Sequence, residues 1–341
     1  MIDTKVYYPN QLKDAAEQLK AGQLVAFPTE TVFGLGAMAN NDQAIAKVFE
    51  VKGRPADNPL IVHVSSIDSV KNYVTEIHPW AQKLMEAFWP GPLTIIFPTN
   101  EHLISPLATN HQPSVGLRMP NQIETLLLID MVGFPLVGPS ANLSTKPSPT
   151  QVEHVLHDFS GKIAGVVANR QPLTEIGVES TVVYPTDDQI TILRPGYITA
   201  DMIQEYVDVP VVEKTAQEQL SGEKVMSPGV KYKHYAPKQP VYLVPASADL
   251  ADWQLLIDQL PSAIGLLADQ SLCDRLKDQV AVTYSLGAPG DILTATRNLY
   301  AGLRYFDQRP VEAIIAQGLD STNPQARAYM NRLSKASQHV L

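Results

Sequence analysis

The chain has 341 residues, of which 45% are hydrophobic and 18% charged, and its formal net charge at pH 7 is −9. This length exceeds the usual size of one hydrophobic core, which predicts two domains, and the composition excludes a disordered chain. The only cysteine, Cys273, excludes an internal disulfide framework and a cysteine-rich zinc site. No apolar run reaches the length of a membrane span and residues 1–8 lack a signal-peptide pattern, so we expect a cytoplasmic protein without membrane association.

The negative charge is concentrated in the first part of the chain. Residues 1–205 contain 13 Lys+Arg and 21 Asp+Glu, a balance of −8, whereas residues 206–341 contain 13 and 14, a balance of −1. Such an acidic surface argues against an extended nucleic-acid interface. A ligand that carries phosphate would therefore need a local cluster of cations.

Helices and strands are mixed in the first two hundred residues. Asn10 is a candidate N-cap for an amphipathic helix over 11–21, which Gly22 ends. Further helices are predicted at 42–51, 79–88, 123–131, 151–159 and from the cap Thr199 to about residue 207, and strands at 24–27, 60–64, 93–98, 115–119, 136–137, 165–168, 180–184 and 190–194. Because the two types do not alternate strictly, we predict one large, twisted mixed α/β sheet over residues 1–206.

A linker and a second α/β domain are predicted for the rest of the chain. Residues 207–238 have the composition of a linker, although 227–237 are rich in aromatic and basic side chains. After them, strands at 241–244, 264–267, 280–284 and 313–316 alternate with helices at 249–260, 271–277, 291–307 and 324–337. This alternation predicts a small, doubly wound (Rossmann-like) parallel sheet over 239–341. No glycine-rich dinucleotide fingerprint opens it.

Cations are concentrated in the stretch 51–63. Lys52 and Arg54 flank a glycine, and the proline that follows biases Arg54 toward extended backbone. Asn58, also followed by proline, marks a second turn before an apolar strand. Two positive charges on a stiff loop suit a polyanionic ligand. The alternative interpretation is a solvated helix C-terminus, where Lys, Gly and Arg are common.

Other polar stretches also lie next to predicted strands, where open α/β sheets bind ligands. They are 28–36 with Thr29 and Thr31, 114–120 with Ser114 and Arg118, 138–142 with Ser140 and Asn142, and 177–181 with Ser180. Two more serines, Ser144 and Ser148, follow the stretch 138–142, and Arg194 ends the predicted strand 190–194. Each stretch alone is compatible with ordinary turn chemistry, and a lone histidine such as His63 is more often part of a core.

In combination, the stretches resemble the motifs of the YrdC-like threonylcarbamoyl-adenylate synthases. The family's order is kept by Pro-Thr-Glu-Thr-Val-Phe-Gly-Leu-Gly, Lys-Gly-Arg-Pro, Asn-Pro-Leu, Gly-Pro-Ser-Ala-Asn and Glu-Ser-Thr-Val-Val. The segment Ser-Pro-Gly-Val-Lys-Tyr-Lys-His-Tyr-Ala-Pro at 227–237 and the α/β unit after it resemble the longer, two-domain branch. The resemblance covers essentially the whole chain and implies a YrdC-type sheet with a concave site.

The resemblance also implies a reaction. A nucleotidyltransferase of this kind joins L-threonine, bicarbonate or CO2, and ATP into threonylcarbamoyl-adenylate and releases pyrophosphate. The product then serves partner proteins that transfer the threonylcarbamoyl group to the adenosine beside the anticodon of certain tRNAs. Mg²⁺ is expected with the ATP phosphates, although the sequence offers no dedicated carboxylate cage for it.

Residue roles follow from the same resemblance. Lys52 and Arg54 match the catalytic cations, and the nucleotide positions are Lys52, Arg54, Asn58, Ser114, Ser140, Asn142, Ser148 and Arg194. Thr31, His63, Arg118 and Ser180 match the threonine pocket. Arg118 is the best candidate for the threonine carboxylate, because a guanidinium binds a carboxylate bidentately.

The segment 227–237 is predicted to act as a lid. We expect it to fold over the concave site, with Tyr232 or Tyr235 reaching the nucleotide, so that water is excluded from a labile mixed anhydride. The alternative is that its aromatic side chains only dock the two domains together.

Three other classes of function are left open by the sequence. A module of this fold could bind RNA weakly through a cationic concave face, but the −8 balance and the lack of interleaved aromatic and basic residues argue against it. A carbamoyltransferase like the related domain of hydrogenase maturation factors would need zinc-finger segments that one cysteine cannot build. A nucleotide-sensing regulator without turnover is distinguished only by an assay of pyrophosphate release.

Overall fold

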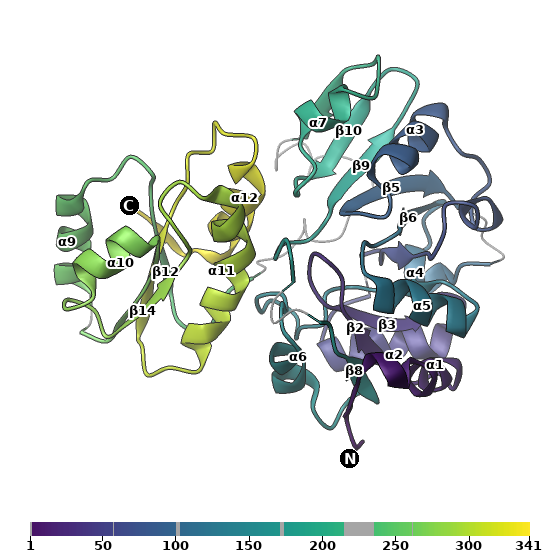
Figure 1. Ribbon diagram of the computed structural model, residues 1–341, viewed down its shortest axis with the longest axis horizontal. Coiled ribbons are helices and arrows are strands. Elements are labelled where there is room, and N and C mark those ends of the chain that lie inside the picture. Colours follow the sequence, from purple (N-terminus) through teal and green to yellow (C-terminus); the bar gives the residue numbers. More distant parts are fainter. Residues whose placement is uncertain (1, 57, 100–102, 171–173, 215–234, 261) are drawn as a thin grey trace. The chain divides into compact units, whose positions relative to one another are not determined.

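The structure, a computed structural model, describes residues 2–56, 58–99, 103–170, 174–214, 235–260 and 262–341. These residues form two compact units (Figure 1). The first contains residues 2–144, 149–175 and 179–214, and the second contains 145–148, 176–178 and the described residues from 235 onward.

The first unit is built on an eleven-stranded mixed sheet in the order β1-β8-β2-β3-β7-β4-β6-β5-β9-β10-β11. The strands are β1 (Lys5–Tyr7), β2 (Val25–Phe27), β3 (Gly34–Met38), β4 (Val62–His63), β5 (Leu93–Pro98), β6 (Ser114–Arg118), β7 (Leu136–Val137), β8 (Gly165–Val167), β9 (Thr181–Pro185), β10 (Ile190–Arg194) and β11 (Val211–Glu213). Parallel and antiparallel pairs are combined: β5 pairs antiparallel with β6 and parallel with β9. The predicted mixed α/β sheet is confirmed.

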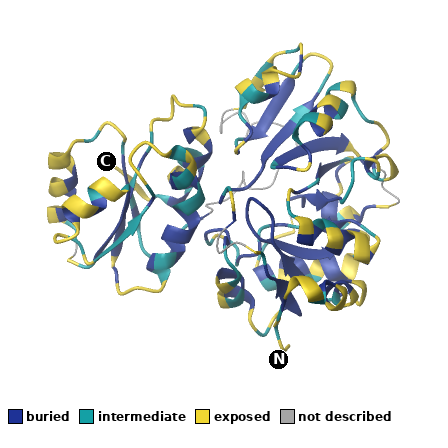
Figure 2. Cartoon of the chain, in the orientation of Figure 1, coloured by how far each residue is buried: buried dark blue, intermediate teal, exposed yellow. Residues whose placement is uncertain are grey.

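Helices cover both faces of this sheet. They are α1 (Leu12–Lys20), α2 (Asp42–Lys52), α3 (Pro79–Phe88), α4 (Pro106–Thr109), α5 (Ile123–Val132), α6 (Val152–Phe159) and α7 (Ala200–Gln204), with short 3-10 turns at Pro9–Gln11 and Val70–Asn72. Successive residues of a strand point to opposite faces. Accordingly, Val25 and Phe27 of β2 pack with α1 and α5, whereas Ala26 packs in the core that includes α2, α3 and α6. Figure 2 shows most strands of this sheet buried and the outer helix surfaces exposed.

The sequence did not predict strand β3, which packs against the ring of Phe27. We expected one polar turn over 28–36, but Gly34 and Gly36 lie in β3, antiparallel to β2. A Cβ at Gly34 would lie 2.8 Å from the Phe27 ring, and one at Gly36 would lie 2.6 Å from the Val25 carbonyl oxygen. The glycines are therefore needed for close packing inside the sheet, where the pattern of polar and glycine residues had indicated a turn.

Two other local expectations were wrong. Asn10 is not the N-cap of α1; a 3-10 turn precedes the helix, and the Gln11 side chain accepts a hydrogen bond from the Tyr8 backbone N–H at 3.1 Å. The strand β11 pairs in parallel with β10, so the first sheet extends into the segment for which we predicted a linker (207–238). Residues 215–234 of that segment lie outside the described residues.

The second unit carries a parallel five-stranded sheet in the order β14-β13-β15-β12-β16. Its strands are β12 (Val241–Val244), β13 (Ile264–Ala268), β14 (Val282–Ser285), β15 (Ala313–Gln317) and β16 (His339–Val340), and its helices are α9 (Leu250–Gln259), α10 (Gln270–Leu276), α11 (Ile292–Asp307) and α12 (Ala326–Ala336). Apart from β16, each element was predicted to within about two residues of its bounds. The doubly wound arrangement is confirmed.

Two short segments from early in the chain also belong to the second unit. The Ala236 N–H donates to the Thr145 carbonyl at 2.9 Å, and Arg304 Nε of α11 donates to the Pro147 carbonyl at 2.9 Å. Gly177 lies directly against α11, since a Cβ there would be 2.4 Å from the Arg297 carbonyl oxygen. Through these contacts, residues 145–148 and 176–178 belong with the later part of the chain.

No helix among the described residues combines the length and apolar character needed to cross a bilayer.

Candidate active site

Hydroxyl groups order the loop between β2 and β3. Thr29 Oγ1 donates to the Val32 carbonyl at 2.7 Å and accepts from the N–H groups of Thr31 and Val32. Thr29 has one hydroxyl proton, so the proton in its 2.7 Å contact with Thr31 Oγ1 must come from Thr31. The remaining hydrogen-bonding capacity of the Thr31 hydroxyl is therefore that of an acceptor.

The Arg118 guanidinium is held on three sides at the end of β6. Nη1 donates to Thr31 Oγ1 at 2.9 Å, and Nε donates to the Gly91 carbonyl at 3.2 Å. Nη2 lies 2.7 Å from Glu30 Oε2, and the two side chains are only 5% and 3% exposed. This ion pair is not aligned as a hydrogen bond: neither Nη2 nor either Glu30 oxygen has a hydrogen-bond partner in the described part of the chain.

His63 lies beside Arg118 because β4 and β6 are parallel and these two residues are register partners. Burial, together with the nearby Arg118 charge, lowers the pKa of His63 to about 3, against the smaller opposing effect of a hydrogen bond to the Leu136 backbone. The ring is thus neutral near pH 7. Its Nδ1 has no hydrogen-bond partner among the described residues and is available as an acceptor.

Backbone contacts connect this cluster to a second one around Ser180. The turn that supplies the Gly91 carbonyl also accepts, at the Pro92 carbonyl, a 3.0 Å hydrogen bond from the Thr181 N–H. Arg194 Nε donates to the Ser180 carbonyl at 3.1 Å, and its Nη2 donates to Ser180 Oγ at 3.2 Å. The Thr94 hydroxyl, 2.8 Å from Ser180 Oγ, completes a buried group of polar side chains.

Lys52 forms the third part of the site. It is the last residue of α2, and Gly53 after it adopts the left-handed conformation (φ +59°) that ends many helices. The helix-end interpretation of this motif is therefore correct, but Lys52 is buried instead of solvated. Its ammonium donates to the carbonyl oxygens of Ser140 and Asn142, the latter at 2.7 Å.

The Ser140–Asn142 loop is tied to the hydroxyl loop. The Ala141 N–H donates to the Phe33 carbonyl at 2.8 Å, and the Leu35 N–H donates to the Pro139 carbonyl at 2.7 Å. The first unit thus joins Thr31, His63, Lys52, Ser140, Asn142, Arg118, Ser180 and Arg194 in one network. Of the remaining predicted residues in that unit, Arg54 follows Gly53 with its N–H donating to the Phe49 carbonyl, Asn58 is buried, and Ser114 begins β6.

Three predicted residues fall elsewhere. Ser148 is buried in the 145–148 segment of the second unit. Tyr235, also in the second unit, is buried with its ring centroid 5.2 Å from that of Tyr300. Tyr232 lies outside the described residues. The roles of all three in nucleotide binding stay predictions.

Sequence reasoning missed two polar members of the network, Glu30 and Thr94. Glu30 stands in a polar turn, where an acidic residue is typically solvated, and Thr94 lies inside an apolar strand. The available signal for Glu30 was its place directly before Thr31 in a quoted motif. Only its contact with Arg118, 88 positions later in the chain, reveals that it is buried in an ion pair.

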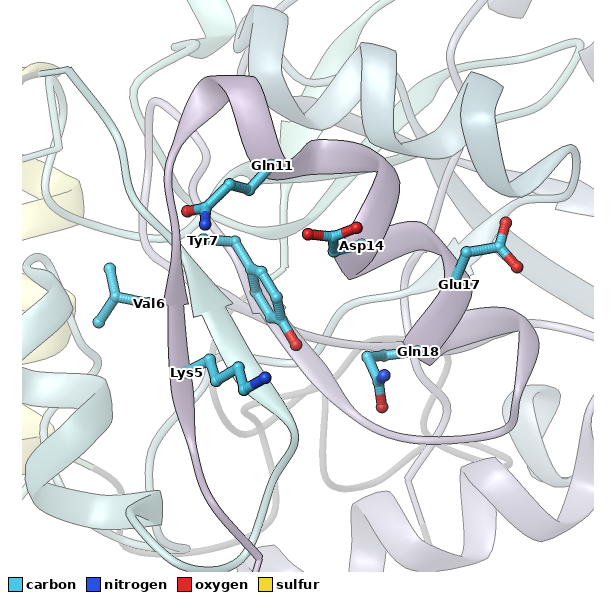
Figure 3. A pocket seen from close by; sticks show the side chains of 7 residues that line it. All are labelled: Lys5, Val6, Tyr7, Gln11, Asp14, Glu17 and Gln18. Carbon is cyan, nitrogen blue, oxygen red and sulfur yellow. The ribbon is translucent and has the colours of Figure 1, made fainter.

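A surface cavity of about 290 Å³ lies between the edge strand β1 and helix α1 (Figure 3). Its lining residues are Lys5, Val6, Tyr7, Gln11, Asp14, Glu17 and Gln18. None of these seven is a predicted site residue, so the cavity does not contribute to the candidate active site.

Comparisons with known proteins agree with the motif resemblance. The Sua5/YciO/YrdC family model, described as telomere recombination, matches residues 17–196, and the model of the threonylcarbamoyl-AMP synthase C-terminal domain matches residues 198–338. The threonylcarbamoyl-AMP synthase of Bacillus subtilis is 41% identical over 330 residues, which cover 96% of this chain and 93% of that protein. That of Pyrococcus abyssi is 37% identical over 332 residues, covering 96% and 94%.

The solved structures give the same result. The crystal structure of Pyrococcus abyssi Sua5 complexed with L-threonine is similar to this structure with a TM-score of 0.89, at 34% identity and with 99% of each chain covered. Family models match both parts of the chain, and full-length relatives exceed 35% identity. The chain therefore belongs to the Sua5/YciO/YrdC family, in the two-domain form that carries the threonylcarbamoyl-AMP synthase C-terminal domain.

Proposed function

We propose that this protein is an L-threonylcarbamoyladenylate synthase, which forms threonylcarbamoyl-AMP and pyrophosphate from L-threonine, bicarbonate or CO2, and ATP. The observation that carries the proposal is the placement of Lys52, Arg118 and Arg194 in one buried network, each oriented by backbone carbonyl oxygens. Oriented, partly desolvated cations stabilise anionic substrates and a developing negative charge. The relatives named above support the same reaction.

The chemistry needs no nucleophile from the enzyme. The threonine ammonium first loses a proton, and the resulting neutral amine forms a C–N bond with CO2 and loses a second proton, which gives a carbamate. A carbamate oxygen then attacks the α-phosphorus of ATP, and the bond to pyrophosphate breaks. The protein's task is to hold the two substrates in line and to compensate the charge of a crowded phosphoryl transition state.

The nucleotide would be bound on the side of the network that carries Lys52. Lys52 and Arg54 would compensate the phosphate charge, and Ser140 and Asn142 lie where their backbone carbonyl groups hold the Lys52 ammonium. Arg194, with Asn58, Ser114 and Ser148, would hold the rest of ATP. Tyr232 or Tyr235 would reach the nucleotide from the lid segment 227–237.

The amino acid would be bound where Arg118 and His63 meet. The Arg118 guanidinium offers a planar donor set for the threonine carboxylate. Thr31 fixes the orientation of that guanidinium, and His63, being neutral, can accept a hydrogen bond from the side-chain hydroxyl of threonine. Ser180, whose hydroxyl oxygen accepts a hydrogen bond from Arg194 Nη2 at 3.2 Å, would complete the threonine pocket.

Mg²⁺ is proposed to enter with ATP. The described residues include no group of three or more His, Cys, Asp and Glu side chains arranged to hold a metal. Mg²⁺ would keep several of its waters and would be held mainly by the ATP phosphates, whose charge it would neutralise. We further propose that the enzyme acts in the cytoplasm and supplies its product to proteins that modify tRNA.

The reaction is tested by incubating the protein with ATP, Mg²⁺, L-threonine and ¹³C-bicarbonate. Mass spectrometry should detect a threonylcarbamoyl-AMP ion shifted by the label, with pyrophosphate released in equal amount. Omitting threonine should abolish both signals. Pyrophosphate release that does not depend on threonine, or nucleotide binding without any turnover, would contradict the proposal.

A further inference from the structure

Glu30 is buried with unmet hydrogen-bonding capacity. Its side chain is 3% exposed, and both carboxylate oxygens lack a hydrogen-bond partner among the described residues, as does Arg118 Nη2 at 2.7 Å from Oε2. Burying a charged group is costly unless it is paired and its remaining hydrogen bonds are satisfied. The charges of the pair therefore cancel, but its hydrogen bonds are not all made. Two acceptor oxygens of Glu30 and the donor nitrogen Nη2 of Arg118 are left for a ligand.

Another buried carboxylate in the same unit shows what a complete pair looks like. Glu124 of α5 is 2% exposed and accepts a 2.8 Å hydrogen bond from Arg170 Nε at one oxygen. Its other oxygen accepts from Gln122 Nε2 at 2.6 Å. Glu124 is thus satisfied by its own surroundings, as expected of a structural ion pair. Glu30 differs from it in having the charge partner without the hydrogen bonds.

A zwitterion would complete the Glu30–Arg118 pair. A free α-amino acid carries an ammonium and a carboxylate on one carbon atom, so it needs an acceptor and a donor that are close neighbours. Glu30 Oε2 and Arg118 Nη2 are such neighbours, and because they are not aligned with each other, turning toward a ligand costs them no hydrogen bond. A net-neutral pair also suits a net-neutral ligand.

We propose that Glu30 binds the α-ammonium group of the amino-acid substrate while Arg118 binds its carboxylate. The inference rests on the proposed function, which places the amino acid at this site. It makes Glu30 a specificity-determining residue: it selects free amino acids over hydroxy acids of the same shape. A role limited to positioning Arg118 is the competing interpretation, because Glu30 touches that guanidinium.

The test compares two ligands that differ only at the ammonium. Calorimetry without ATP measures the affinity for L-threonine and for (2S,3R)-2,3-dihydroxybutanoate, in which a hydroxyl replaces the amine. The wild-type protein should prefer threonine by about tenfold or more, the effect of one hydrogen bond to a charged group. In Glu30→Gln this preference should fall toward one. Glu124→Gln, the matched control, should keep it.

The outcomes separate the competing interpretations. If Glu30 only positions Arg118, Glu30→Gln should change the affinity for both carboxylates by the same factor and leave their ratio intact, which overturns the inference. Equal binding of the two ligands by the wild-type protein overturns it as well, even if the variant fails to fold. If the wild-type protein binds threonine and makes the adenylate but shows no preference, only this inference fails. If it binds no threonine, the proposed function fails with it.

Discussion

His63 and Arg118 are register partners on the parallel strands β4 and β6, so a neutral histidine lies next to a permanent cation in the core of the first unit. Burial and the Arg118 charge both oppose protonation of His63, whose pKa falls to about 3. An unfolded histidine has a pKa of about 6.5. The difference couples the stability of the first unit to pH.

The stability of the first unit should decrease as the pH falls, because of His63. Below about pH 6.5 the unfolded chain takes up a proton at this position that the folded chain refuses until about pH 3, so the free energy of unfolding decreases over this range. At pH 5 the loss relative to pH 8 should be about 2 kcal/mol from this residue. His63→Gln should remove that part of the pH dependence.

The measurement is urea unfolding at pH 8, 6 and 5, followed by tryptophan fluorescence. A Trp253→Phe background confines the signal to Trp80 and Trp89, which belong to the first unit. The free energy of unfolding is then compared between this background and the same protein with His63→Gln added. If it depends on pH in the same way in both proteins, the buried neutral histidine is contradicted.

Arg118→Lys should affect threonine far more than ATP. A lysine keeps the charge but loses the planar fork and cannot reproduce the bonds to Thr31 and the Gly91 carbonyl together. The KM for threonine should rise by about tenfold or more, while the KM for ATP changes by less than about threefold. Steady-state pyrophosphate release measures both. An equal rise for both substrates would place Arg118 on the nucleotide side.

Arg54→Ala should reduce turnover without unfolding the protein. Loss of one charge-assisted contact to a developing anion costs roughly 2–4 kcal/mol of transition-state stabilisation. Lys20→Ala is the matched control, because Lys20 is also a cation near the end of a helix but is exposed and pairs with Glu17. Thermal unfolding should be similar for both variants. Pyrophosphate release by Arg54→Ala within about threefold of the wild-type rate would exclude this role, since the expected loss is far larger.

Strands that consist mostly of apolar residues and are flanked by turn signals could be predicted from the sequence, including where they begin and end. Leu93–Pro98, Leu136–Val137 and Ile190–Arg194 were predicted at the residues where the structure has them, because strands buried on both faces are made mostly of apolar residues. The alternating second unit was predicted for the same reason. Local pattern fails at Gly34–Met38, where the ring of Phe27 occupies the space of the missing side chains.

The prediction of the site had the same limit, because local sequence does not show contacts between distant parts of the chain. The motif resemblance identified residues by type, and the structure joins eight of them in one network of the first unit. Glu30 could not be identified, because an acidic residue in a polar turn has no local signal for burial. Its significance depends on Arg118, a partner on a distant strand. Likewise the local sequence could not show that the Lys52 ammonium is buried, because the carbonyl oxygens of Ser140 and Asn142 that accept its hydrogen bonds lie about 90 positions later in the chain.

Gly138→Ala should weaken both stability and threonine binding. A Cβ at this position would lie 2.6 Å from the Phe27 ring and 2.7 Å from His63 Nδ1, both buried. Such overpacking typically costs about 1–3 kcal/mol, and the displaced imidazole would no longer present its acceptor. Gly133→Ala is the control: its φ of +76° makes alanine strained, but no atom lies within 4 Å of the added Cβ. Urea unfolding should detect a cost in both, whereas calorimetry should show weaker threonine binding only for Gly138→Ala.

The last prediction concerns the segment 227–237. Tyr235, at its described end, is buried against Tyr300 in the second unit, so this end of the segment is anchored there. A lid would therefore have to close through the residues before it, which contain two trypsin sites, Lys231 and Lys233. If the segment closes over the nucleotide, cleavage at these two lysines should slow by about tenfold or more when ATP and threonine are both saturating, because tryptic cleavage requires the open state. A segment that only docks the domains should be cut at the same rate with and without substrates. Threonine alone serves as the control, because a lid that covers the nucleotide needs ATP to close. Protection by threonine alone would assign the closure to the amino-acid pocket instead.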